Sequence, residues 1–271
     1  MAGGGVSMRW VGVVCMCLLV LGCEERAAPV ADNAASERRA PEISTSSNRL
    51  RNASFEAESA APWFDFSDRN PSQWGAFTIE QTHAREGRRA ALLELDSEGV
   101  QGAVRVLGVV QEITGPCPAY VSGWYFVERW ERGCERQYLQ VVAIASGGWT
   151  PPGVSNYQVA RTLAGVESPP LRMKNRRFEV GGPSEPELGR WVFFEVDLAS
   201  MFERRWGRAP GEDAHIRLFF EARYDGRTPG DPRAVARVWF DDLYAGPESR
   251  SGSAAGSGSG SGAGSGAGAS P

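Results

Sequence analysis

Two adjacent carboxylates, Asp241 and Asp242, interrupt the apolar segment RVWFDDLYAG at residues 237–246. Paired carboxylates can act as general acid and base, and in glycoside hydrolysis they lie about 5 to 9.5 Å apart. The segment is typical of a β-strand, and successive side chains of a strand point to opposite faces of the sheet. Asp241 and Asp242 therefore cannot act together on one substrate, whichever of them faces the solvent.

Other catalytic arrangements have little support in the sequence. Glu195 and Asp197 share one face of the segment RWVFFEVDL, with Glu221 on a strand that could adjoin it, but a solvated strand face is the favoured explanation for such charges. His83 and His215 have no further ligand at the spacing of a zinc site. No serine lies in a G-x-S-x-G turn and no glycine-rich phosphate loop follows a strand. We therefore expect a protein that is not an enzyme.

The N-terminus has the pattern of an export signal. The apolar run at residues 10–22 is shorter than the about 20 residues that span a bilayer, and it ends at Cys23. The sequence LVLGC resembles the bacterial lipobox, which implies a signal peptide over 1–22 and a lipidated, palmitate-bearing Cys23 that anchors the protein to a membrane. Glu24 is not the Asp that favours retention in the inner membrane, so we expect an outer-membrane lipoprotein, on the periplasmic face or the cell surface. A plain secretory signal is the alternative, and translation from Met8 would give a tidier signal.

The remaining chain divides by composition into a tether, one domain and a tail. Residues 23–50 have few large apolar side chains and are predicted to be a disordered tether, and residues 248–271 form a Gly/Ser/Ala-rich tail. Residues 51–247 are the right length for a single domain. The net charge of −4 and the pI near 5.5 argue against a nucleic-acid partner, and short basic groups such as KNRRF read as solvated loop charges.

Two cysteines, Cys117 and Cys134, remain in the domain. An exported protein permits a disulfide, which would contribute about 3 kcal/mol of stability in the chain-entropy model. If AYVSGWYFV between them is one straight strand, however, its ends are about 30 Å apart, beyond the limit of about 7 Å between bridged Cα atoms. The bridge requires the loop at 128–134 to fold back along the sheet, and we predict it on that condition.

The domain itself reads as a series of β-strands. Short runs rich in Val, Ile, Phe, Tyr and Trp alternate with turns, as in HIRLFFEARY at 215–224 and RWVFFEVDL at 190–198. The first puts Ile216, Leu218 and Phe220 on one face and a mixed set of side chains on the other. Only ASMFERRW, at 199–206, suggests a helical turn. About nine strands without a long amphipathic helix predict an all-β sandwich of two packed sheets.

In such a sandwich, one aspartate of RVWFDDLYAG must lie against the body of the domain. A buried carboxylate is costly unless it is paired or bound to a metal. The ends of a domain often lie close together, and the first segment, NASFE, supplies Glu56. Oxygen donors of this kind suit calcium, so a structural Ca²⁺ ion is predicted between the two ends.

Several segments, in order, resemble the galactose-binding-like jelly-roll carbohydrate-binding modules. They are NASFE, HAREGRRAALLEL, AYVSGWYFV, GRWVFFEVDL and RVWFDDLYAG. The resemblance implies a jelly roll with a calcium held by the side chains of Glu56 and Asp241, with Asp242 as the alternative to Asp241. Backbone oxygens near Glu86 and Gly87 would complete the site.

The resemblance further implies that the domain binds a glycan. Proteins bind sugars with flat aromatic faces and planar polar side chains. The candidate ligand-binding residues on the mixed face and in loops are Trp130, Trp149, Tyr157, Arg217, Phe219, Glu221 and Arg223. Strand aromatics are more often part of a core. The alternative is a structural lipoprotein that uses the same scaffold to bind a protein or another component of the cell envelope.

Overall fold

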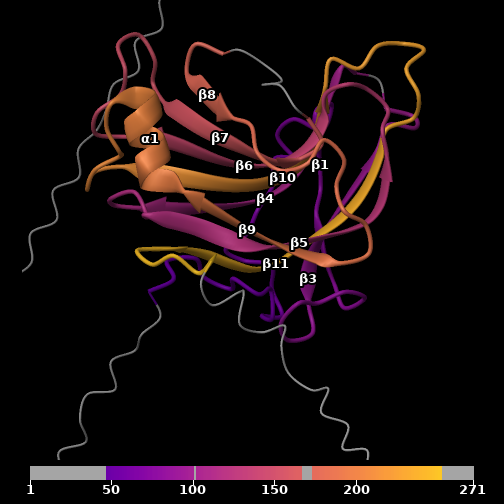
Figure 1. The fold of residues 1–271 in the computed structure, drawn as a ribbon, viewed down its shortest axis with the longest axis horizontal. Helices are drawn as coiled ribbons and strands as arrows, with labels where there is room; N and C mark the ends of the chain where they lie inside the picture. The colour runs from indigo at the N-terminus through magenta and orange to yellow at the C-terminus, as the bar shows by residue number, and fades with distance from the viewer. Residues whose placement is uncertain (1–46, 101, 167–172, 252–271) are drawn as a thin grey trace, which may run out of the picture. The chain divides into compact units, whose positions relative to one another are not determined.

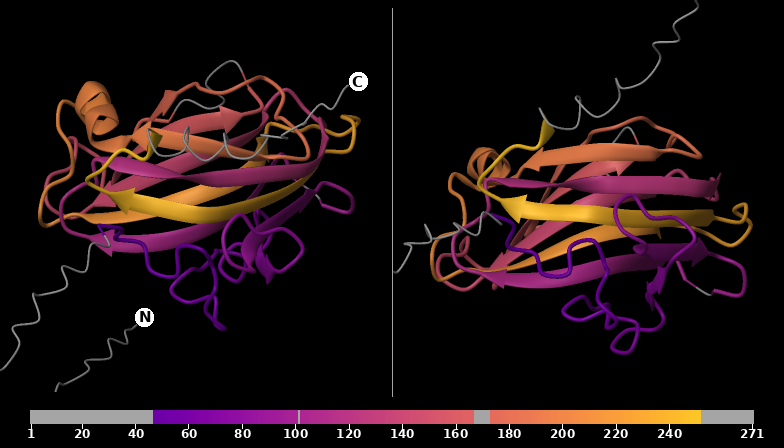
Figure 2. Two further views of the ribbon diagram at one scale, coloured as in Figure 1. Left: turned by 60° about the horizontal axis from the view of Figure 1, so that its bottom comes forward. Right: turned by 90° about the horizontal axis from the view of Figure 1, so that it is seen from below.

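Two β-sheets packed face to face form the domain, as a computed structural model of residues 47–100, 102–166 and 173–251 shows (Figures 1 and 2). The predicted signal peptide, Cys23, and most of the predicted tether and tail lie outside these described residues. The six-stranded sheet consists, in spatial order, of β1 (Trp74–Gly75), β4 (Val104–Thr114), β10 (His215–Asp225), β6 (Gln137–Ser146), β7 (Tyr157–Ala164) and β8 (Arg176–Glu179). The five-stranded sheet consists of β2 (Thr78–Glu80), β3 (Ala90–Asp96), β11 (Val235–Gly246), β5 (Tyr120–Glu131) and β9 (Trp191–Asp197). The predicted all-β, two-sheet jelly-roll sandwich is confirmed.

Most neighbouring strands run antiparallel, and the long central strands set the register of each sheet. In the six-stranded sheet, β10 pairs along its whole length with β4, from His215 opposite Thr114 to Asp225 opposite Val104. In the five-stranded sheet, β11 lies between β3 and β5, with a register shift just after Asp241. Asp241 still pairs with Trp124, whereas Asp242 lies within the irregularity.

The core lies between the sheets and follows the alternation expected from the sequence. Ile216, Leu218 and Phe220 on β10 are buried in it, as predicted for this face. Phe194 and Val196 on β9 approach from the opposite sheet, and the rings of Phe194 and Phe220 have centroids 6.0 Å apart. At about 25 cal/mol per Å² of apolar surface, the burial of these side chains between the sheets is the main stabilising term of the fold.

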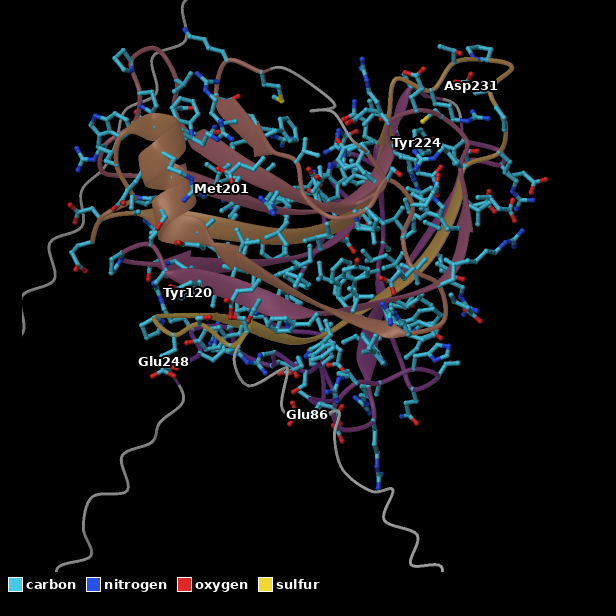
Figure 3. The ribbon with its side chains drawn as sticks, in the orientation of Figure 1. Glu86, Tyr120, Met201, Tyr224, Asp231 and Glu248 are labelled. Carbon is cyan, nitrogen blue, oxygen red and sulfur yellow. The ribbon has the colours of Figure 1, made fainter. Side chains whose placement is uncertain are left out.

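One helix, α1 (Leu198–Trp206), follows β9 directly and corresponds to the predicted helical turn (Figure 1). Asp197 caps its first turn by accepting a hydrogen bond from the Ser200 backbone N–H at 3.2 Å. Gly207 ends it with φ of 80°, a left-handed conformation that glycine adopts without strain. Met201 lies on this helix at the same end of the sandwich as Tyr120 (Figure 3), and it is buried in the core.

The two ends of the domain lie together, as expected. The Arg49 N–H donates to the Ala245 carbonyl at 2.8 Å, and the Asn48 side chain bonds both Ala245 and Leu243 of β11. After β11, the Ser249 hydroxyl donates a hydrogen bond to Glu195 of β9. The packed domain therefore extends a few residues beyond the predicted 51–247 on both sides. No helix among the described residues is long and apolar enough to cross a membrane.

Candidate functional site

A hollow of about 310 Å³ opens between the loop that joins β6 to β7 and the loop that follows α1. The close approach of these loops depends on Gly147, whose φ is 77° and at which an added Cβ would lie 2.6 Å from the Asp213 carbonyl oxygen. The side chains and backbone that line the hollow belong to Gly147, Gly148, Trp149, Tyr157, Arg208, Ala209, Pro210, Gly211, Glu212, Asp213 and Ala214.

Trp149 is the exposed aromatic residue of this hollow, which we call the Trp149 hollow, and it is 38% exposed. The buried Tyr157 ring meets it edge-on, with centroids 5.3 Å apart, and holds it from below. Burial raises the pKa of Tyr157 to about 12, so its hydroxyl stays protonated. The guanidinium of Arg208 lies 5.1 Å from the Trp149 ring centroid. The structure thus brings together two of the predicted residues, Trp149 and Tyr157.

The hollow combines an apolar surface with hydrogen-bond acceptors. The exposed indole offers a flat apolar surface, and the exposed Glu212 and Asp213 offer hydrogen-bond acceptors beside it. A ligand with an apolar face and several hydroxyl groups would satisfy both kinds of surface.

The outer face of the six-stranded sheet holds four other predicted residues, but most of them are covered. Phe219 on β10 is 3% exposed. It lies in a second apolar cluster with buried and half-buried side chains that belong to Phe64, Phe66, Trp74, Val110, Val142, Ile144, Ala160 and Phe178. The loop at 64–74 crosses this face of the sheet, and the Phe66 ring stacks on Phe219 at 6.0 Å. Phe219 therefore packs as a core residue.

Glu221 and Arg223 belong to a buried ionic network beside that cluster. Arg223 lies between Glu221, at 3.4 Å, and Asp225, to which it donates a short hydrogen bond. Gln140 on β6 donates to Glu221 at 2.5 Å, and the Tyr138 hydroxyl bonds Asp225. Although burial opposes the charge, these neighbours raise the pKa of Arg223 above its usual range.

Two polar atoms of this network, Gln140 Oε1 and Arg223 Nε, have no hydrogen-bond partner among the described residues. Glu221 is 2% exposed and Arg223 7% exposed, so neither offers much surface to a ligand as the structure stands. Their role in binding stays a prediction, and it would require the side chains above the sheet to move.

The remaining candidates are dispersed. Arg217 is exposed on β10 and pairs with Glu112 at 2.7 Å, a bond that lowers the pKa of Glu112. Trp130 is half-buried near the end of β5 and packs against the main core. Neither lines the Trp149 hollow.

Glu195, Asp197 and Glu221 do not form the acid–base cluster considered above. Glu195 and Asp197 lie on β9 in the five-stranded sheet, whereas Glu221 lies in the six-stranded sheet. Sequence alternation showed which residues share a strand face, but it could not show which strands are neighbours. Asp197 instead caps α1, and Glu195 accepts bonds from Ser249 and from the backbone N–H of residue 250.

The closing strand buries one of its two aspartates, as predicted. Asp241 is fully buried, and Asp242, with φ of 48°, pairs with Arg250 at 2.7 Å. The Asp241 carboxylate accepts backbone N–H bonds from Arg85 at 2.6 Å, from Glu86 at 3.0 Å and from Asp242 at 2.7 Å. Figure 3 shows Glu86 in the loop beside the five-stranded sheet.

Glu56 holds the same loop from its other side. It accepts the N–H bonds of Arg88 and Arg89 at 2.8 and 2.7 Å. A cation binds carboxylate oxygens that are free to face it, whereas both Asp241 oxygens and one Glu56 oxygen here face N–H donors. The described residues hold no group of three or more His, Cys, Asp or Glu side chains placed to bind a metal ion. Glu56 and Asp241, as placed, do not fit a shared calcium ion, although the calcium prediction itself stays untested.

The predicted disulfide is absent: Cys117 and Cys134 are both free thiols. β5 runs between them as one strand of 12 residues, which spans about 40 Å. Cys117 lies near Tyr120, whereas Cys134 lines a hollow with Asp231 at the opposite end of the sandwich (Figure 3). The loop at 128–134 does not fold back, because β5 continues through Glu131.

Comparison of the sequence with protein-family profiles and with curated proteins finds no match.

Proposed function

We propose that this protein is a non-catalytic, glycan-binding lipoprotein whose ligand lies in the Trp149 hollow. The observation that carries the proposal is the exposed Trp149 ring at an open hollow, with the Glu212 and Asp213 carboxylates beside it. A pyranose has a face of C–H groups that packs on an indole and a rim of hydroxyls that donate to carboxylates. The two-sheet jelly roll is compatible with the resemblance to carbohydrate-binding modules.

The proposed anchor is the lipid on Cys23, which would hold the domain at the outer membrane. The support is the LVLGC sequence and the composition of residues 24–46, rich in Ala, Ser, Pro and charge. A tether of this length would let the domain reach glycans near the membrane surface.

A glycan array probed with the full chain and with Trp149→Ala tests the binding proposal. Loss of one stacked aromatic ring should weaken binding by about 2- to 12-fold, since such contacts are worth about 0.5–1.5 kcal/mol beyond the area that they bury. Trp124→Ala, on the outer face of the five-stranded sheet, is the matched control, because it removes a half-buried tryptophan far from the hollow. Equal binding by wild type and Trp149→Ala would exclude the hollow as the site.

A second candidate function is the binding of a protein or another envelope component. Four half-exposed aromatic side chains lie on the outer face of the five-stranded sheet, two on β5 and two on the edge strand β9. They are Trp124, Phe126, Trp191 and Phe193. An aromatic patch of this kind is typical of protein interfaces. Recovery of one crosslinked protein by wild type but not by Trp191→Ala, with no glycan bound, would favour this function.

A further inference from the structure

Three arginine side chains converge on one carboxylate close to the Trp149 hollow. Glu179 on β8 lies 3.2 Å from both Arg204 and Arg205 of α1. Arg161 on β7 lies 3.5 Å from the same carboxylate. The Glu179 side chain is only 12% exposed, whereas those of the three arginines are between 39% and 54% exposed. One carboxylate offsets one guanidinium, so positive charge remains at the surface.

Aromatic rings connect these arginines to the hollow. The guanidinium of Arg177 lies 4.2 Å from the Trp206 ring centroid, at the end of α1. Trp206 contacts the Tyr157 ring at 5.7 Å, and Tyr157 contacts Trp149 at 5.3 Å. Arg208 lies over Trp149 itself. A chain of contacts therefore runs from Arg177 through Trp206, the buried Tyr157 and Trp149 to Arg208.

A lysine extends the same surface on the other side. The Lys174 ammonium donates to the Gly153 carbonyl at 3.3 Å, which joins the segment before β8 to the loop that carries Trp149. We call the cations Arg161, Lys174, Arg177, Arg204, Arg205 and Arg208 the basic surface. On α1 and β8, the acids within it are Glu179 and Glu203. This excess of positive charge stands out in a chain whose net charge is −4.

We infer that the ligand is an acidic glycan, whose sugar ring lies on Trp149 and whose carboxylate, sulfate or phosphate groups bind the basic surface. The inference rests on the proposed function and specifies its ligand class. Arginine forks match such anionic groups in geometry and charge. At the hollow, Glu212 and Asp213 can accept hydrogen bonds from hydroxyl groups but repel anionic groups. A ligand with hydroxyls at one position and anionic groups at another, as in an acidic glycan, is therefore favoured over a phospholipid surface or a nucleic acid.

The experiment measures binding of the full chain to polygalacturonate and to its fully methyl-esterified form, at low and at moderate salt. The two polymers have the same sugar backbone, and the methyl ester removes the negative charge of each carboxylate. Arg204→Gln/Arg205→Gln is compared with the control Arg129→Gln/Arg233→Gln, which makes the same change in net charge at other exposed ion pairs. Dextran sulfate is a second polyanion, and vesicles with anionic lipid test the membrane alternative.

Polygalacturonate should bind more tightly than its methyl ester, and salt should weaken the binding of polygalacturonate. Arg204→Gln/Arg205→Gln should lower the affinity about 5- to 10-fold, and the control double variant should leave it unchanged. Wild type that binds neither polyanion at low salt overturns the inference, as does equal binding of the acid and the ester. Equal binding of both forms with loss in Trp149→Ala would overturn the acidic ligand and leave the proposed function standing.

Binding of polyanions and anionic vesicles alike, unaffected by Trp149→Ala, would overturn the glycan function and the inference together. Unfolding midpoints of all variants are measured alongside, and the ratio of affinities for the acid and ester forms remains informative where a variant is less stable.

Discussion

Asp241 gives the domain a dependence on pH that one substitution should remove. The carboxyl is fully buried, and burial raises its pKa from the ordinary 3.8 to about 6, despite three backbone N–H bonds that act in the opposite direction. Between these values the folded protein holds a proton that the unfolded chain releases. Protonation therefore favours the folded state, and the stability contributed by this group is lost as pH rises from about 4 to 6.

The magnitude follows from the two pKa values. One pKa unit corresponds to about 1.4 kcal/mol, so the free energy of unfolding should fall by up to about 3 kcal/mol across this window. For a domain of this size that is a fall of about 6 to 12 °C in Tm. Asp241→Asn cannot ionise, so this component of the pH dependence should disappear.

Urea unfolding of the full chain at a series of pH values from 4 to 7.5, followed by tryptophan fluorescence, measures the effect. The quantity of interest is the difference between wild type and Asp241→Asn, because Asp96 and Glu112 have lowered pKa values and act with the opposite sign in both proteins. Asp242→Asn is the control, since Asp242 is half-buried and paired with Arg250. If the two proteins differ in free energy of unfolding by the same amount at every pH, Asp241 does not titrate with a raised pKa in the folded domain.

Three further outcomes are expected for the calcium ion, the cysteines of the domain and the lipid anchor. Because Glu56 and Asp241 accept backbone N–H bonds, EDTA should leave Tm unchanged, and a fall in Tm that Glu56→Ala abolishes would instead support the predicted calcium ion. Reducing agent should also leave Tm unchanged, because both cysteines are free thiols. A thiol reagent should modify Cys117 much more slowly in the folded than in the unfolded protein, since burial raises its pKa to about 12. A shift in Tm caused by the reductant would indicate a bridge to Cys134. Palmitate should label the wild-type protein but not Cys23→Ala, and label that persists in the variant would exclude the proposed anchor.

The sequence was informative where periodicity alone decides the outcome. Alternation on β10 predicted that Ile216, Leu218 and Phe220 enter the core, because a strand has only two faces. The same rule predicted that only one of Asp241 and Asp242 would be buried. It could not reveal that the partners of Asp241 are backbone N–H groups of a loop more than 150 residues away.

The basic surface shows why the site was harder to predict. KNRRF and the arginines of α1 are about 25 residues apart, and each looks like an ordinary solvated group in the sequence. Only the parallel pairing of β8 with β7, together with the position of α1, brings Arg177, Arg204 and Arg205 to one place. Likewise, Glu221 and Arg223 looked like free polar side chains, because the loop that covers their sheet comes from residues 64–74.

Contact between a glycan and Trp149 can be observed in the indole N–H signals of the tryptophans. The full chain, labelled with ¹⁵N, is titrated with polygalacturonate and with its methyl ester while these signals are recorded by NMR. Assigned through Trp149→Ala, the signal of Trp149 should shift progressively, with smaller changes at Trp206, while those of Trp124 and Trp191 stay in place. An unchanged Trp149 signal during saturable binding would show that the glycan binds elsewhere on the protein.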